Sequence, residues 1–490
     1  MAGELRSIGR HTLVYGIGTA VGKLASFLML PVYTRYLTPA DYGVLELMGT
    51  TIDVVAMIAG LGLAGALFKE YAAIDDPAER ARMISTVTLA SGALSAVAAV
   101  AGIAAAPLLA GRVLDGAAPA LWLQLFFVIY FLQSLSGIPF MLMRAEDRSL
   151  LFVWLNVAKL VGTLALNIVF VVKLGMGVPG VILGNVIASG VLGVALTAWT
   201  FRRVGFAFSF PLARRLGRFG SPLVVWSLAS FVLVFSDRYF LVHYAGAAEV
   251  GIYSLACRFG FLLSAFAVTP LSQVWEPRRF VVARQADAQA VFRRVFLWQN
   301  VALGFCGAGI VLLVGDVLAL MASPAFAPAA RVVPLVVAAT VLQQWTGFCN
   351  LGLFVTDRTR TYAWTGIVGV VVALSLNAAL IPRWGIWGAA WATVGAFAVR
   401  FAAVYVMAQR AYPIGYGWEK TAVLAAVFSA AVALRALSPL APGLASAALA
   451  MGLLALSAAA VYALVLDEED RAAVRGILRR RAVGLAAGTA

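Results

Sequence analysis

The sequence predicts an all-α polytopic membrane protein with fourteen transmembrane helices, arranged as two pseudo-symmetric six-helix lobes plus two C-terminal helices. Three observations predict this fold class. Hydrophobic residues make up 62% of the chain and charged residues only 12%, which is more apolar surface than a water-soluble protein can accommodate. The apolar residues are collected in runs long enough to cross a bilayer. Short motifs in the first half of the chain recur in the second half.

The apolar runs follow one another with short loops between them. At a rise of about 1.5 Å per residue, each run can cross a hydrocarbon core about 30 Å thick. The two longest loops, 201–220 and 274–294, have about twenty residues each, which is too few for a soluble domain. The runs fall near 12–34, 43–68, 83–108, 119–143, 150–172, 178–200, 219–242, 250–272, 295–315, 331–355, 362–381, 385–408, 420–437 and 443–466.

The first run carries one charge, Lys23, at the middle of its predicted helix. Small and polar residues on both sides of Lys23 recur in steps of three and four, so they share one helical face. An ammonium group at the helix centre costs roughly 2.5 to 3.5 kcal/mol in lipid, so this face should point into a bundle or an aqueous cavity. We predict that Lys23 lies on a substrate path; the alternative is a lysine that snorkels or pairs with a neighbour. The run lacks a small-residue cleavage site and is expected to be a retained helix.

The basic residues predict the orientation of the helices. With a cytoplasmic N-terminus, 26 lysines and arginines fall in cytoplasmic loops and tails, and six fall in the opposite loops. This asymmetry follows the positive-inside rule and predicts that both termini are cytoplasmic. The net charge of +15 is therefore explained by membrane orientation, and no nucleic-acid partner is expected.

The strongest organisational signal is the internal repeat. Corresponding segments lie six helices apart, an even number, so the two halves run in the same sense and are related by an axis along the membrane normal. We predict an N-terminal lobe over 1–218, a C-terminal lobe over 219–410 with a cleft between them, and two additional helices with a basic cytoplasmic tail over 411–490. Three segments recur in the same order: Leu24–Phe27 as Leu228–Phe231, the predicted loop Pro39–Gly43 as the predicted loop Ala247–Gly251, and Leu166-Asn167 as Leu376-Asn377.

Five basic residues fall inside the predicted membrane spans: Lys23, Lys159, Arg238, Arg258 and Arg400. A lysine or arginine in a span usually faces a protein interior or a water-filled path. Ammonium and guanidinium groups bind phosphate through charge-assisted hydrogen bonds, so these residues are candidates for binding a phosphorylated substrate. For Arg238 and Arg258 the alternative is snorkelling or ion pairing, and the polar pattern around Arg400 is the weakest of the five.

Three acidic residues in the spans, Glu46, Asp53 and Asp237, are candidates for coupling transport to an ion. Burial raises the pKa of a carboxyl group and makes it a usable proton relay, whereas a buried carboxylate is also tolerated simply because it is paired. On another predicted helix Gln343 and Asn350 form a polar face that could bind sugar hydroxyls. Hydrogen bonds between packed helices explain that face equally well.

Several kinds of site are not expected. The three cysteines lie in apolar runs and give neither a disulfide framework nor metal-ligand spacing. The two histidines have no triad partners, and the sequence has no glycine-rich phosphate loop of the ATP-binding type. We therefore predict no catalytic residue, no metal and no cofactor.

Several segments together resemble the polysaccharide transporters, the Wzx-type flippases of O-antigen and exopolysaccharide. This family belongs with the multidrug and toxic compound extrusion transporters and the lipid II flippases. The resemblance covers almost the whole chain, but its motifs are typical of packing and turns and carry no catalysis. It is carried by Tyr33–Gly43, Ser236–Arg238 followed by Glu249–Tyr253, Trp275–Pro277, Gly352–Thr361, Leu376-Asn377, Ile381-Pro382, Gly385 and Gly388–Thr393.

The resemblance implies a flippase in the bacterial inner membrane. Such a protein would move an undecaprenyl-pyrophosphate-linked oligosaccharide from the cytoplasmic to the periplasmic leaflet by alternating access, for surface polysaccharide assembly. Its partners would be the lipid-linked oligosaccharide, membrane lipids, and a polysaccharide polymerase with glycosyltransferases. The alternatives are a lipid II flippase or a small-molecule exporter on the same scaffold. A membrane glycosyltransferase or polymerase is the alternative from another class, although the short external loops argue against it.

Overall fold

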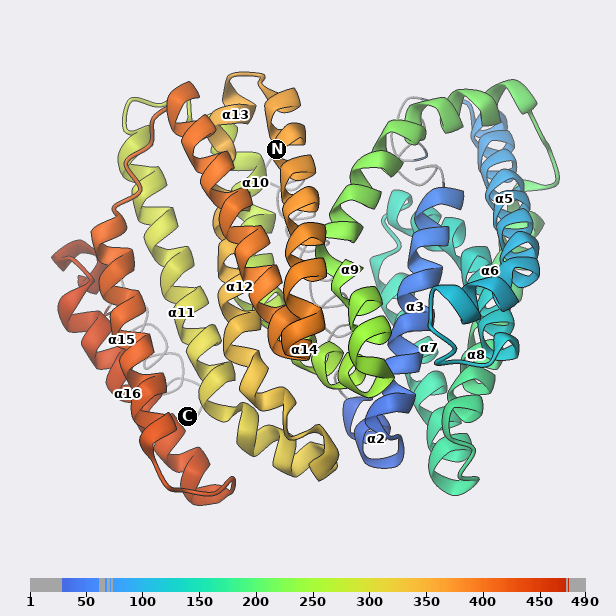
Figure 1. Ribbon diagram of the computed structural model, residues 1–490. Coiled ribbons are helices and arrows are strands. Elements are labelled where there is room, and N and C mark those ends of the chain that lie inside the picture. Colours follow the sequence, from blue (N-terminus) through green and yellow to red (C-terminus); the bar gives the residue numbers. More distant parts are fainter. Residues whose placement is uncertain (1–28, 61–66, 68–70, 72–73, 473–474, 476–490) are drawn as a thin grey trace, which may run out of the picture. The chain divides into compact units, whose positions relative to one another are not determined.

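The computed structural model describes residues 29–60, 67, 71, 74–472 and 475, which form helices joined by short loops and contain no strand (Figure 1). The helices, in chain order, are α2 (Leu30–Tyr36), α3 (Pro39–Ala59), α5 (Pro77–Arg112), α6 (Ala120–Ala145), α7 (Ser149–Asn167), the π-helix η1 (Ile168–Lys173), α8 (Gly177–Val204), α9 (Phe210–Leu263), the π-helix η2 (Ser264–Val268), α10 (Thr269–Val282), α11 (Ala288–Met321), the short 3₁₀ helix η3 (Pro324–Phe326), α12 (Ala329–Cys349), α13 (Leu351–Val355), α14 (Thr359–Ala411), α15 (Trp418–Leu437) and α16 (Leu444–Leu464).

The described residues contain twelve helical segments that are long and apolar enough to cross a membrane. One of them, Ser227–Val282, is two spans joined at Gly246, whose φ of 84° breaks the helix. Gly385 breaks α14 in the same way, with a φ of 53°. The described parts of the predicted runs after the first are therefore helical, and the predicted all-α polytopic fold is confirmed. The run at 12–34, including Lys23, lies mostly outside the described residues.

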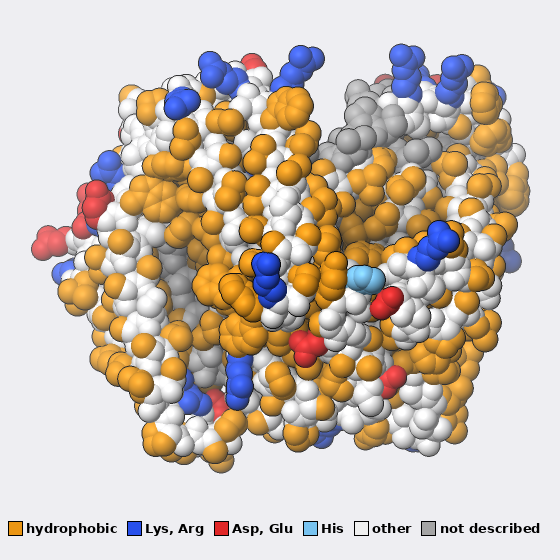
Figure 2. All heavy atoms as spheres, viewed as in Figure 1, with side chains coloured by type: hydrophobic (Ala, Val, Ile, Leu, Met, Phe, Trp, Pro, Cys, Tyr) orange, Lys and Arg blue, Asp and Glu red, His pale blue; other side chains and the backbone are white. Residues whose placement is uncertain are grey.

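The surface confirms that this is a multi-pass membrane protein. Figure 2 shows hydrophobic side chains over most of the visible helix surfaces, with several lysines and arginines along the upper edge of the view. Large apolar side chains point outward, among them Val97, Trp154 and Val191, which are 68 to 69% exposed. An apolar surface of this extent needs a hydrocarbon environment.

Packing groups the chain into two compact units. The first consists of residues 1–258, 321–339 and 359–403, and the second of 259–320, 340–358 and 404–490. In the first unit α6 packs against both α5 and α8, and α7 packs on α8. The predicted lobes at 1–218 and 219–410 follow the sequence repeat instead of these units, and that division stays a prediction.

In the first unit the repeated motifs make repeated contacts. Asn167 Nδ2 donates to the Tyr33 hydroxyl (3.2 Å), and its counterpart Asn377 donates through Nδ2 to Ser236 Oγ (3.2 Å). Both asparagines are buried, so a hydrogen-bond partner avoids a substantial desolvation cost. The same side chain therefore ties the fifth predicted run to the end of the first, and the eleventh to the end of the seventh.

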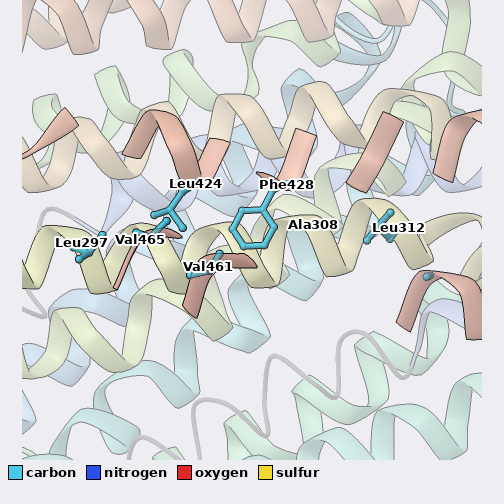
Figure 3. Packing of buried hydrophobic residues seen from close by; sticks show 8 residues of the cluster. Leu297, Ala308, Leu312, Leu424, Phe428, Val461 and Val465 are labelled. Atoms are coloured by element: carbon cyan, nitrogen blue, oxygen red, sulfur yellow. The ribbon is translucent and has the colours of Figure 1, made fainter. Parts of the chain in front are cut away.

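In the second unit α15 and α16 pack against α11 around an apolar cluster (Figure 3). The ring of Phe428 fills the space that a side chain at Gly304 would need, since a Cβ there would lie 2.2 Å from the ring. Beyond the end of α16, Lys420 Nζ donates to Asp467 Oδ2 (2.5 Å), and this bond lowers the pKa of the Asp467 carboxyl group. The two C-terminal helices are thus packed against α11, and a charged hydrogen bond ties the start of α15 to the chain after α16.

Candidate functional site

The beginning of α3 and the segment of α9 after Gly246 meet at a very close contact, here called the seam and made of Pro39, Gly43, Ala247 and Gly251. A Cβ atom on Gly43 would lie 1.9 Å from the Ala247 carbonyl oxygen. A Cβ on Gly251 would lie 1.9 Å from the Pro39 carbonyl oxygen. The contact is therefore reciprocal, and only glycine at both positions lets the two backbones approach this closely.

The local sequence sets the geometry of the α3 side of the seam. Pro39 is the first residue of α3. A backbone N–H at this position has no acceptor within the helix, so the absence of one in proline costs no hydrogen bond. Thr38 caps the helix, since Asp41 N donates to its Oγ1 (3.1 Å) and its own N–H donates to Asp41 Oδ2 (3.0 Å). This capping box fixes where α3 starts and therefore where Gly43 lies.

An ion pair between Glu46 and Arg258 lies beside the seam. Glu46 follows Gly43 by one turn on α3, and Arg258 follows Gly251 by two turns on α9. The Glu46 side chain is 14% exposed and that of Arg258 is 41% exposed, so the guanidinium keeps access to its surroundings while bonded to the carboxylate. The pair therefore links α3 to α9 across 212 residues of sequence.

A second pair, Asp237 and Arg238, is buried deeper, with side chains 5% and 2% exposed. Arg238 Nη1 donates to Asp237 Oδ1 at 3.0 Å. The Tyr253 hydroxyl donates to Asp237 Oδ2 at 2.7 Å, and the Thr393 hydroxyl lies 3.4 Å from the same oxygen. Arg238 also stacks over the Phe235 ring, at 4.7 Å from the centroid. The Asp237 carboxylate thus neutralises the Arg238 guanidinium, which is almost completely enclosed by protein.

Both pairs use an arginine of α9: Arg258 binds Glu46 on α3, and Arg238 binds Asp237 on α9 itself. The third predicted acid, Asp53, lies two turns beyond Glu46 on α3, and its side chain is exposed. Of the three candidate coupling acids, Asp53 alone has no hydrogen-bond or ion-pair partner in the part of the chain that the structure describes.

Lys159 lies on α7 and is half-buried. Within the described ranges no acidic side chain comes within ion-pair distance of it. Two polar residues on the same face of α7 bond to the backbone: Asn156 Nδ2 donates to the Phe152 carbonyl oxygen (2.8 Å), and Thr163 Oγ1 donates to that of Lys159 (2.8 Å). The ammonium group therefore remains available to an anion.

Arg400 lies on α14 and is 8% exposed. Its Nη2 is 3.5 Å from the Tyr362 hydroxyl, and its guanidinium lies 5.8 Å from the centre of that ring. The aliphatic part of the side chain packs against Gly369, where a Cβ would lie 3.1 Å from Arg400 Cδ. Its contacts are thus those of a packed interior side chain.

The two predicted sugar-binding residues, Gln343 and Asn350, lie in the second unit. Gln343 is half-buried on α12. Asn350 is buried, and its Oδ1 accepts a hydrogen bond from Arg279 Nη1 (3.0 Å). Arg279 in turn pairs with Glu276 (2.7 Å). The Asn350 amide oxygen is thus engaged by a neighbouring helix.

Sequence reasoning missed the seam and the two hydroxyls that hold Asp237. It recognised Pro39–Gly43 and Ala247–Gly251 as equivalent, but it predicted them wrongly as loops, whereas both are helical, and it did not predict that they touch. The available signal was that Gly43 and Gly251 end the two equivalent segments at the same position. Equivalent glycines near a symmetry axis permit a reciprocal contact between the two segments. Nothing in the sequence pattern pointed to Tyr253 or Thr393 as partners of Asp237.

Disrupting the pair beside the seam should reveal direct coupling between its members. Glu46→Gln and Arg258→Gln are each expected to destabilise the protein. The double variant should lose less than the sum, with an interaction energy of about 1 to 3 kcal/mol. A double-mutant cycle on detergent-induced unfolding measures this energy. Strict additivity would mean that the bond between Glu46 and Arg258 contributes nothing to stability.

Comparison with known proteins gives consistent results. Residues 8–280 match the model of a protein family described as "Polysaccharide biosynthesis protein". The succinoglycan biosynthesis transport protein ExoT of Rhizobium meliloti (strain 1021) is 24% identical over 252 residues. That match covers 51% of this chain and 49% of ExoT, so it spans about half the length of the relative.

Solved structures share the fold at low sequence identity. The lipid II flippase MurJ in an inward closed conformation superimposes with a TM-score of 0.74 and 11% identity, covering 92% of this chain and 99% of MurJ. An inward-facing multidrug resistance transporter of the MATE family, in the MOP superfamily, gives a TM-score of 0.61 and 14% identity, covering 82% of this chain and 96% of the transporter. At these identities the likeness establishes the fold alone.

Proposed function

Because the chain belongs to the polysaccharide biosynthesis protein family, whose model matches more than half of its residues, we propose that it is a flippase for a lipid-linked oligosaccharide. It moves an undecaprenyl-pyrophosphate-linked oligosaccharide from the cytoplasmic to the periplasmic leaflet of the bacterial inner membrane and changes no covalent bond. Both termini are cytoplasmic in this proposal, as the distribution of basic residues predicts.

The seam is the observation that carries the proposal. Alternating access requires a contact that closes one side of the membrane and opens again. The seam joins equivalent segments of the two sequence repeats through small residues, so opening it separates two backbones and breaks the adjacent Glu46–Arg258 pair. The predicted orientation puts it at the periplasmic end. We assign it as the contact that separates and reforms during transport.

The charges divide into two groups in this proposal. Lys159, which has no acidic partner among the described residues, and the partly exposed Arg258 are the candidates to bind the diphosphate. Arg238 and Arg400 are too buried to reach a substrate and hold the helices together.

Lys23 keeps its proposed place on the path but lies outside the described residues. Asp53 is the best candidate for ion coupling, since Glu46 and Asp237 already bind arginines.

Reconstitution tests the function directly. Purified protein is placed in vesicles with undecaprenyl-pyrophosphate-linked oligosaccharide, and a membrane-impermeant glycosidase reports how much of the lipid has reached the outer leaflet. We expect protein-dependent exposure of chemically unchanged lipid. Equal movement of lipid II would assign the alternative cargo, and extrusion of an organic cation without lipid movement would assign an exporter. Any extension or transfer of the sugar would identify an enzyme.

Removing the Lys159 ammonium should weaken transport while leaving the protein folded. Lys159→Ala is expected to lower translocation about ten-fold, the value of one lost charge-assisted hydrogen bond, and Lys159→Arg should retain most of it. Lys173→Ala is the matched control, because Lys173 is an exposed lysine at the end of η1, directly after α7. Normal surface polysaccharide in a deletion strain carrying Lys159→Ala would remove Lys159 from the substrate path.

A further inference from the structure

A groove lies on the first unit between α5, α6 and α8, well apart in sequence from the seam. It consists of a cavity of about 340 Å³ and an adjoining one of about 480 Å³, which share Leu135, Thr197 and Phe201. α6 contributes the central residues, and α5 and α8 contribute the two sides. The groove extends along α8 from Val194 to Arg202, roughly 12 Å at the rise of a helix.

The lining of the groove is mostly hydrocarbon, and apart from Arg202 its polar side chains are the hydroxyls of Thr88, Ser91, Ser134 and Thr197. Ser134 Oγ donates to the Phe131 carbonyl oxygen (2.7 Å), and Thr197 Oγ1 donates to that of Leu135 (2.8 Å). Thr88 Oγ1 likewise donates to the Ile84 carbonyl oxygen (2.8 Å). Since the hydroxyls of Ser134, Thr197 and Thr88 are engaged with the backbone, the groove suits an aliphatic chain and not a sugar or a polar solute.

One end of the groove is aromatic and basic. Phe206 stacks on Phe201 at 4.3 Å between ring centres and is 78% exposed. The loop that carries Phe206 is fixed to α5, since Ala207 N donates to Ser85 Oγ (2.8 Å) and Ser209 N to Thr86 Oγ1 (3.1 Å). This end therefore keeps its shape without a bound ligand.

Arg202 lines the same end and is exposed. Its neighbour Arg203 is engaged, because it binds Glu146 at 3.0 Å and stacks over Trp199 at 4.8 Å. Arg202 has no such partner in the described part of the chain. An apolar groove that ends at an available guanidinium is complementary to a lipid with apolar chains and an anionic headgroup.

We propose that this groove binds one anionic membrane phospholipid, with its phosphate on Arg202 and one acyl chain between α5 and α8. The length of the groove supports a phospholipid, because roughly 12 Å approaches the depth of one leaflet in a hydrocarbon core about 30 Å thick. An undecaprenyl chain is several times longer than the groove. Exposed phenylalanine and arginine at one level are also typical of the membrane interface.

Native mass spectrometry of the full-length, delipidated protein tests the proposal, with phosphatidylglycerol and phosphatidylcholine of identical acyl chains as probes. We expect phosphatidylglycerol to bind about five-fold more tightly, the effect of about one arginine at a membrane surface, and Arg202→Gln to remove this preference. Arg284→Gln, which changes another exposed arginine, should keep it. Equal affinity for both lipids in the parent protein, or an unchanged preference in Arg202→Gln, would overturn the proposal.

Filling the groove gives an independent test. Nothing lies within 4 Å of a Cβ at Gly92, which lines the groove, so the side chain of Gly92→Leu should enter the groove and lower the affinity for both lipids about ten-fold or more. Gly162→Leu, on α7 with equal space, is the matched control. If Gly92→Leu fails to fold, Ala93→Leu, at an exposed lining position, replaces it. Parent-level binding in these variants, or displacement of phosphatidylglycerol by equimolar undecaprenyl phosphate, would refute the phospholipid assignment.

Discussion

Gly43→Ala is expected to abolish most transport, whereas Gly49→Ala on the same helix should leave it near the parent level. A methyl group at Gly43 would lie 1.9 Å from the Ala247 carbonyl oxygen and 2.8 Å from Gly251 N. Backbone atoms cannot rotate away as a flexible side chain can, so the two segments must separate. Overpacking of this kind costs about 1 to 3 kcal/mol or more, which is enough to shift a two-state equilibrium strongly away from the closed seam.

Gly49 makes this comparison sharp, because nothing lies within 4 Å of a Cβ built there. In a helix interior, glycine to alanine alone should stabilise α3 by about 0.5 to 1 kcal/mol. The measurements are lipid-linked oligosaccharide exposure in vesicles and thermal unfolding in detergent. A Gly43→Ala protein that is folded and transports normally would show that the cycle does not need the closed seam. Gly251→Ala should reproduce the effect, because the contact is reciprocal.

Asp237→Asn is expected to produce the largest loss of stability, about 3 to 5 kcal/mol. The amide still accepts a hydrogen bond from Tyr253 but no longer neutralises Arg238, whose side chain is 2% exposed. A buried guanidinium without a counter-charge is far more costly than a buried pair, which explains the size of the effect. Unfolding in mixed detergent micelles, followed by tryptophan fluorescence, measures the loss.

A second variant separates charge from packing. Asp237→Asn combined with Arg238→Met removes the uncompensated charge and keeps an apolar side chain against Phe235. This double variant should recover most of the lost stability, because replacing a buried pair with uncharged groups is often neutral. If it is no more stable than Asp237→Asn alone, the hydrogen bonds of the carboxylate matter and its charge does not.

The candidate site was predictable in composition but not in arrangement. The sequence identified Glu46, Asp237, Arg238 and Arg258 as charges within membrane spans, and it left pairing open as one explanation. Helical periodicity says which residues share a face of one helix. It does not say which face of another helix lies opposite, and Glu46 and Arg258 are 212 residues apart. The partner of a buried charge is therefore a tertiary property.

Local chemistry decides the conformation at some helix ends, although the prediction began the second run at residue 43 and missed the start of α3 at Pro39. The Thr38-Pro39 start of α3 and the glycine turns at Gly175 and Gly385, with φ of 64° and 53°, follow from residues next to each other in sequence. The kink at Gly246 is of the same kind. By contrast, the close approach at Gly43 and Gly251 depends on two segments that only the folded chain brings together.

By itself, then, the sequence determined the membrane class, the succession of spans and the equivalence of the two repeats. These follow from hydrophobicity and from spacing along one chain, because each apolar segment is sorted into the bilayer by its own length and composition. The tertiary structure alone decided which charges are neutralised, that Lys159 has no acidic partner among the described residues, and that the repeated glycine segments touch. Such contacts depend on how separate helices pack. Within a bilayer, shape complementarity and polar pairing decide which helices associate, and hydrophobicity does not.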